Sequence, residues 1–183
     1  MRLTLFDVLF LLALAGGAAW GFYRGVLRQS VNTALIYISV VAATVGYRGL
    51  SRLLRGTGQP APATDMLAFL ILLGVLNLLL FLMARELIGE FNAERMHIAS
   101  NVFGMVFGFL NAAIYCSVLL VVLRSSTAGD PWIGYENFRL FVRDQTANSW
   151  MAFIFRPFMY VLLAIVKPWM FGYDLPPLLM NAL

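Results

Sequence analysis

The stretch "LAGGAAWGFYRGVLRQS", residues 14–30, decides the fold of this chain. It places small residues at regular intervals, carries Arg24 and Arg28, and lies between one apolar segment and the next. The whole sequence has the composition of a membrane protein, since 61% of its 183 residues are hydrophobic and 12% are charged. Soluble domains carry about 25% charged residues. The chain is therefore expected to form one compact membrane domain, and its scattered basic residues exclude a nucleic-acid-binding face.

Four apolar segments approach the length of a membrane crossing. They are residues 3–23, 31–47, 66–84 and 102–123. A helix of about 20 residues spans the roughly 30 Å hydrocarbon core of a bilayer. Because lipid leaves no water for backbone N–H and C=O groups, the segments are expected to be helices. The sequence predicts an all-α, polytopic membrane bundle with four transmembrane helices in residues 1–124.

Residues 125–183 are predicted to form an amphipathic C-terminal region, either interfacial or re-entrant. Its apolar run is interrupted at Arg156-Pro157 and at Lys167-Pro168, which leaves too few residues between them to span a bilayer. A fifth span beginning near Ser149 is the alternative. An earlier piece has Phe138, Phe141 and Val142 opposing Arg139 and Arg143.

Basic residues near the ends of the segments predict that the N-terminus lies on the cytoplasmic side of the membrane. With four crossings, this orientation puts five arginines on the cytoplasmic side and four on the other. The first set is Arg2, Arg48, Arg52, Arg55 and Arg124, and the second is Arg24, Arg28, Arg85 and Arg95.

Small residues recur at every fourth position in the first and fourth segments. The first series is Ala13, Gly17, Gly21 and Gly25, and the second is Ser100, Gly104, Gly108 and Ala112. Residues four apart are neighbours on a helix surface. In lipid, helices associate through close backbone contact, which small residues permit. We therefore expect the first and fourth helices to pack together through these two faces.

Several polar residues in or near the segments are candidates for contacts with other helices, lipids or ligands. Asp7 lies in the first segment and Asn111 in the fourth, so the two are candidates for an intramembrane polar site. Arg24 and Arg28 are four residues apart, and we expect them to contact anionic lipid headgroups or a partner protein. The partner would be a second copy of this chain or another membrane protein.

The sequence does not predict an enzyme, a cofactor or a metal site. Glu94 and His97 have the E-x-x-H spacing of di-iron bundles, but such sites need a second copy of the motif, and His97 is the single histidine. No phosphate-binding or dinucleotide-binding glycine motif is present.

Two parts of the chain resemble the colicin V production protein (CvpA) family. The first is an early aspartate, Asp7, followed by G-F-x-R-G-x-x-R from Gly21 to Arg28. The second is "NVFGMVFGFLNAAIY", which is similar to the family's last span through Phe103, Gly104 and Gly108. The resemblance covers residues 3–123. It implies a multi-pass protein of the bacterial inner membrane, linked to toxin production or export and to envelope homeostasis, without established catalytic activity.

Two functions therefore remain as expectations. The first is a non-enzymatic membrane protein of this family, embedded in the bilayer and contacting anionic headgroups. The second is a small oligomeric transporter or channel, in which Asp7 and buried asparagines would line the path.

Overall fold

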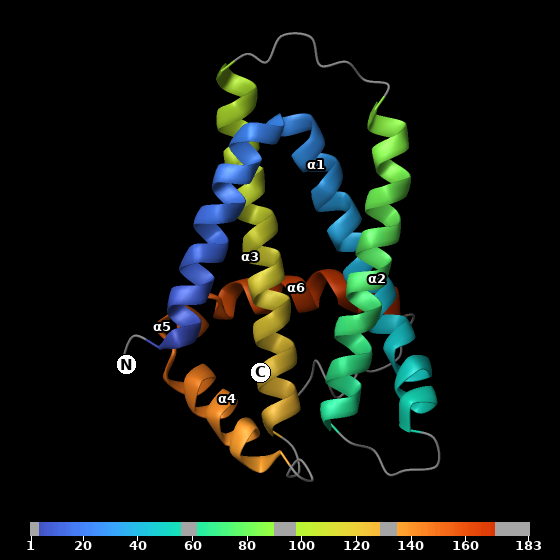
Figure 1. Cartoon of the computed structure of the whole chain (residues 1–183), viewed down its shortest axis with the longest axis vertical. Coiled ribbons are helices and arrows are strands. Elements are labelled where there is room, and N and C mark those ends of the chain that lie inside the picture. Colours follow the sequence, from blue (N-terminus) through green and yellow to red (C-terminus); the bar gives the residue numbers. More distant parts are fainter. Residues whose placement is uncertain (1–3, 56–61, 90–97, 129–134, 171–183) are drawn as a thin grey trace.

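The computed structural model describes residues 4–55, 62–89, 98–128 and 135–170, and all regular elements within them are helical. The three long helices are α1 (Leu5–Arg55), α2 (Pro62–Gly89) and α3 (Ile98–Ala128) (Figure 1). Each is long and apolar enough to cross a membrane. The predicted all-α membrane fold is therefore confirmed, and the predicted spans 66–84 and 102–123 lie within α2 and α3.

Helix α1 is interrupted at Gly25, where the backbone has φ 76° and ψ 168°. This region of backbone conformation is accessible essentially to glycine alone. It divides α1 into a first arm, residues 5–24, and a second arm, residues 26–55. Figure 1 shows the two arms meeting at the top of the view and descending along separate paths. The predicted segments 3–23 and 31–47 thus fall on different arms of one bent helix.

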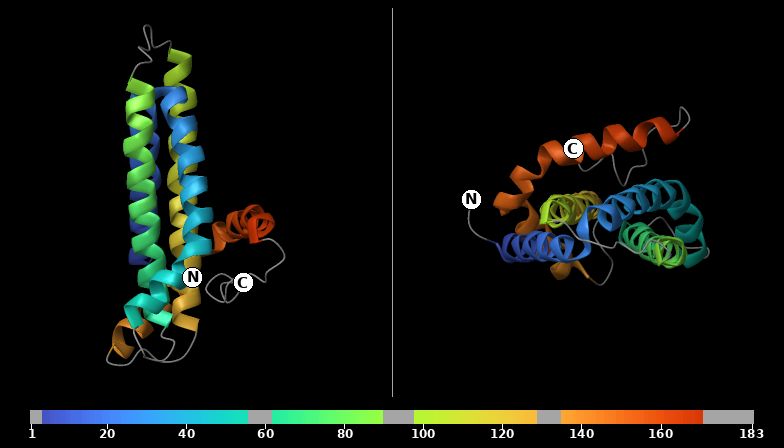
Figure 2. Two further views of the ribbon diagram at one scale, coloured as in Figure 1. Left: turned by 90° about the vertical axis from the view of Figure 1, so that its right-hand side faces the viewer. Right: turned by 90° about the horizontal axis from the view of Figure 1, so that it is seen from above.

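Helix α3 packs against both arms of α1 and contributes to two hydrophobic clusters (Figure 2). One cluster joins the second arm, α2 and α3, with Ile36, Phe69 and Val121 almost fully buried. The other joins the first arm to α3 and includes Phe10 and Cys116. Because α3 supplies side chains to both clusters, it holds the bent helix α1 in its folded-back shape.

The described part of the C-terminal region, residues 135–170, forms four short helices: α4 (Glu136–Asn148), α5 (Trp150–Ile154), α6 (Arg156–Val166) and the 3-10 helix η1 (Lys167–Met170). The helix boundaries at Arg156 and Lys167 coincide with the predicted interruptions. Helix α6 is about 17 Å long and runs across the bundle rather than along it (Figure 2). A fifth span starting near Ser149 is therefore not formed by the described residues.

The predicted opposition of Phe138, Phe141 and Val142 to Arg139 and Arg143 holds in α4 only for Val142, which is buried, and Arg143, which is exposed. Arg139 is 8% exposed, whereas Phe138 and Phe141 are exposed. The guanidinium of Arg139 donates 3.1 Å to the carbonyl oxygen of Thr127, near the end of α3, and pairs with Glu136. The last carbonyls of a helix lack partners within the helix, so a buried arginine can satisfy them. The hydrogen bond to Glu136 raises the pKa of Arg139.

Candidate functional site

The first arm of α1 and helix α3 touch through backbone atoms at their glycines. A Cβ atom built on Gly21 would stand 2.8 Å from the Cα atom of Gly108. A Cβ atom on Gly108 would in turn stand 2.7 Å from the Cα atom of Gly21, and one on Gly17 would stand 2.8 Å from the Gly108 carbonyl oxygen. Real Cβ atoms essentially never come this close to other heavy atoms. We call this contact the glycine seam, and it leaves no space for any larger side chain.

Of the remaining small residues in the two series, some lie at the contact between α1 and α3 and one does not. A Cβ atom on Gly104 would lie 2.8 Å from the Cα atom of Gly25, so the glycine seam extends to the bend. Ser100 reaches the start of the second arm, where its hydroxyl accepts a 3.4 Å hydrogen bond from the Val26 N–H. Ala112 contributes the Cβ atom that faces Gly17. Ala13, in contrast, is exposed.

The exposure of Ala13 has a geometric reason. An α-helix has 3.6 residues per turn, so a series at every fourth position rotates gradually around the helix. The buried face of the first arm continues from Gly21 through Leu14 and Phe10 instead. The close contact therefore begins at Gly17, and larger side chains fill the wider space near the start of α1.

Asn111 is part of a buried polar cluster just beyond the bend. Its side-chain amide donates 2.8 Å to the side-chain oxygen of Gln29 and 3.3 Å to the Gln29 carbonyl oxygen. The hydroxyl of Thr33 donates 2.7 Å to the Asn111 side-chain oxygen. Asn111 and Gln29 are 4% and 3% exposed. These bonds link α3 to the second arm, as the glycine seam links α3 to the first.

Asp7 is fully buried and connects the start of α1 to the C-terminal region. Its carboxylate accepts hydrogen bonds from the Ser149 hydroxyl and, at 2.8 Å, from the Met151 N–H. It also accepts from the N–H and hydroxyl of Thr4, at 2.8 Å and 3.0 Å. Ser149 in turn caps α5 by accepting from the Ala152 N–H. Asp7 and Asn111 therefore belong to separate hydrogen-bond networks rather than to one polar path.

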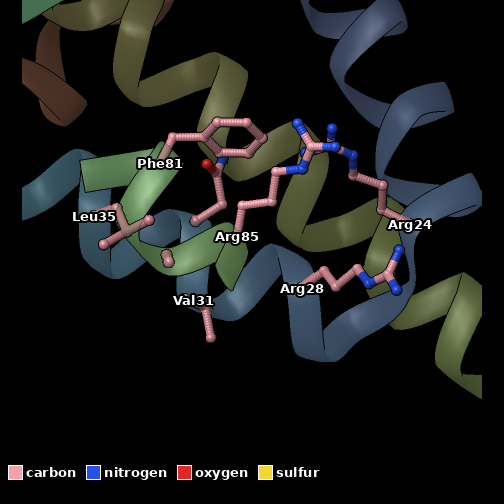
Figure 3. Close-up of a pocket in the computed structure, with 8 residues that line it drawn as sticks. Arg24, Arg28, Val31, Leu35, Phe81 and Arg85 are labelled. Carbon is pink, nitrogen blue, oxygen red and sulfur yellow. The ribbon is translucent and has the colours of Figure 1, made fainter. Parts of the chain in front are cut away.

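Arg24 and Arg28 line a surface cavity of about 300 Å³ at the end of the bundle where α1 bends (Figure 3). The bend lies between them, so they belong to different arms. A third arginine, Arg85 of α2, lines the same cavity, together with Asn32. The other lining residues are Val31, Leu35, Phe81 and Ala84. No carboxylate from the described residues lines this cavity, which we call the arginine pocket.

Two aromatic rings hold Arg24 in place. Its Cζ atom lies 4.8 Å from the centre of the Trp20 ring and 5.4 Å from that of Phe81. Figure 3 shows the side chains of Arg24 and Arg85 extending into the same space beside Phe81. Cation–π contacts of this kind orient a guanidinium while leaving its N–H groups available for hydrogen bonds.

Several residues that complete these sites carry no recognisable sequence signal. Ser149 lies 142 positions from Asp7 and Arg85 lies far from Arg24 in the chain, so no spacing rule connects them. Gln29 was not among the predicted site residues, although its side chain pairs with that of Asn111. Glu94 and His97 lie outside the described residues. Among the described residues, no group of three metal-ligating side chains occurs.

The long apolar helices, the glycine seam and the buried polar contacts together define a multi-pass helical membrane protein. The chain belongs to the colicin V production protein family, whose sequence pattern matches residues 6–159. This match confirms the resemblance seen in the motifs around Gly21 and Gly104, and it extends through α4 and α5 into α6. Comparison with curated proteins and with solved structures gave no match.

Proposed function

We propose that this chain is a non-enzymatic inner-membrane protein with four crossings that takes part in the production or export of a colicin V-type toxin and in envelope homeostasis. Its family membership supports the toxin role, because the family is named for the production of colicin V. The proposal of four crossings depends on one observation, the bend at Gly25, which folds one long helix back along α3.

Each arm of α1 has the length needed for a crossing of its own. The first arm is about 30 Å long and the second about 45 Å, against a hydrocarbon core of about 30 Å. Together with α2 and α3 they would cross the bilayer four times. The C-terminal helices α4 to α6 would then lie at the membrane interface or re-enter it.

The distribution of basic residues supports a cytoplasmic N-terminus. Three described arginines line the pocket at the bend, and they would face the periplasm. The opposite end of the bundle carries more positive charge, as the positive-inside rule requires of the cytoplasmic side. The described arginines at this opposite end are Arg48, Arg52, Arg55, Arg124, Arg139 and Arg143.

Arg24 and Arg28 would contact anionic lipid headgroups or a partner protein at the periplasmic surface. Asp7 would act as a structural tie, since the donors of Thr4, Ser149 and Met151 occupy both carboxylate oxygens. This arrangement supports a scaffold built around α3 rather than a conducting path through Asp7.

The test is toxin release from cells that carry a colicin V-type toxin system but lack their own member of this family. We expect the chain to restore release, and Gly108→Leu to abolish it because leucine does not fit the glycine seam. Gly74→Leu is the matched control, since a Cβ atom on Gly74 meets nothing within 4 Å. Full release without any family member, or from Gly108→Leu present at normal levels, would contradict the proposal.

A further inference from the structure

We propose that the arginine pocket binds a phosphate group with at least two negative charges, such as the phosphomonoester head of an anionic lipid. The inference deepens the proposed contact of Arg24 and Arg28 with headgroups and rests on the pocket lying at a membrane surface. It adds Arg85, Asn32 and Phe81 to the site, and it names the chemistry of the ligand.

The first support is that arginines from three segments of the fold line one pocket. Arg24 ends the first arm, Arg28 lies near the start of the second, and Arg85 is on α2. Like charges gathered in one cavity repel each other unless an anion lies between them. No carboxylate among the described residues lines the pocket. The ligand is therefore expected to supply the negative charge.

The second support is preorganisation of the donors. The Arg24 guanidinium is held by Trp20 and Phe81, with its Cζ atom 4.8 Å and 5.4 Å from the ring centres. A guanidinium held in this way loses little freedom when it binds an anion. Its fixed fork of N–H groups matches two oxygens of one phosphate. Several such forks favour a dianionic phosphate over a single carboxylate.

The third support is the composition of the rest of the lining. Val31, Leu35, Phe81 and Ala84 place apolar surface beside the arginines. A ligand that uses the whole pocket therefore needs a charged end and an apolar end. The volume of about 300 Å³ lies at the lower limit of small-molecule pockets. It suits the head of a lipid whose chains remain in the bilayer, and it also admits a free diphosphate.

Binding is measured by native mass spectrometry on the full-length chain, released from nanodiscs of phosphatidylcholine that contain a small fraction of phosphatidic acid. We expect one phosphatidic acid to be retained in preference to phosphatidylcholine. Arg85→Gln and Arg24→Gln should each weaken retention about tenfold or more. Arg143→Gln is the matched control, because it removes the same charge from an exposed position on α4, and it should retain the lipid normally.

Equal retention of phosphatidic acid and phosphatidylcholine would overturn the proposal, as would equal losses in Arg85→Gln and Arg143→Gln. If Arg24→Gln unfolds, as judged by circular dichroism, the exposed Arg85 carries the test alone. Displacement of phosphatidic acid by inorganic pyrophosphate at concentrations as low as those of the lipid would favour a soluble phosphate compound as the source, and resistance to millimolar pyrophosphate would favour a lipid. This binding assay involves no toxin. A negative result would therefore overturn phosphate binding without contradicting the proposed role in toxin export.

Discussion

The Cα atom of Gly108 lies 2.8 Å from the point that a Cβ atom on Gly21 would occupy. The backbones of α1 and α3 are therefore in direct contact over the length of the glycine seam. Lipid-facing helices gain little from burying apolar side chains, so close packing and interhelical hydrogen bonds must hold them together. The seam supplies the first, and the Gln29–Asn111 pair supplies the second.

Replacement of Gly25 should destabilise the bend in α1. Gly25→Ala is expected to lower the free energy of unfolding by about 1–3 kcal/mol, because φ 76° with ψ 168° is strained for any residue with a Cβ atom. Gly25→Asn should not rescue stability, since asparagine tolerates the left-handed helical region and not this one. Unfolding in mixed micelles on titration with SDS measures the effect. Gly49→Ala, an open position on the same helix, should be harmless.

Loss of the Asp7 charge should release the C-terminal helices from the start of α1. Asp7→Asn leaves one carbonyl oxygen where two oxygens accept from Ser149, Met151 and Thr4, and each lost hydrogen bond to a charged group costs about 1.5–3 kcal/mol. Hydrogen exchange at the amides of Met151 and Ala152 should become faster. Unchanged exchange there, combined with ion flux into liposomes that the substitution abolishes, would instead favour a transport path through Asp7.

Gln29 and Asn111 should be energetically coupled. Removal of either side chain takes the 2.8 Å hydrogen bond from the other, which stays buried with that bond unmade, whereas removal of both leaves neither amide in need of it. We therefore expect the double variant Gln29→Leu/Asn111→Leu to be more stable than the sum of the single changes predicts, by about 0.5–3 kcal/mol. A double-mutant cycle on SDS unfolding measures this coupling. Strict additivity would show that the 2.8 Å contact contributes nothing.

The helices and the faces that pack were accessible from the sequence because both depend on local spacing. Apolar length predicted α2 and α3, and small residues at intervals of four predicted where α1 and α3 would meet. Spacing could not reveal that Gly25 joins two predicted spans into one bent helix, since the bend depends on a single backbone conformation. It also placed Ala13 on the contact, because a period of four drifts from the true helical period.

Contacts between distant segments could not be predicted at all. Asp7 meets Ser149 and Arg85 joins Arg24 because of how the helices are arranged in three dimensions. The predicted amphipathic pattern of α4 was wrong at Phe138, Phe141 and Arg139 for a related reason. Arg139 is buried because it reaches the carbonyl of Thr127 on α3, which is a requirement that the sequence of α4 does not display.

The second arm of α1 should cross the membrane, so that its two ends lie on opposite sides. Cysteines introduced at the exposed positions Arg28 and Arg52 should react with a membrane-impermeant maleimide from the periplasmic and cytoplasmic sides, respectively. Cys116 is 4% exposed and should remain unlabelled, so the unaltered chain serves as the blank. Labelling of Arg28→Cys and Arg52→Cys from the same side would contradict two crossings within α1.

The most direct measurement of backbone contact in the glycine seam compares alanine at Gly21 and at Gly16, two positions on the same arm. A Cβ atom on Gly21 would clash with backbone atoms of α3, whereas one on Gly16 meets nothing within 4 Å. In SDS titrations of the purified chain, we expect Gly21→Ala to lose about 1–3 kcal/mol of unfolding free energy and Gly16→Ala to lose none. Equal stability of the two variants would contradict a fold held together by touching backbones.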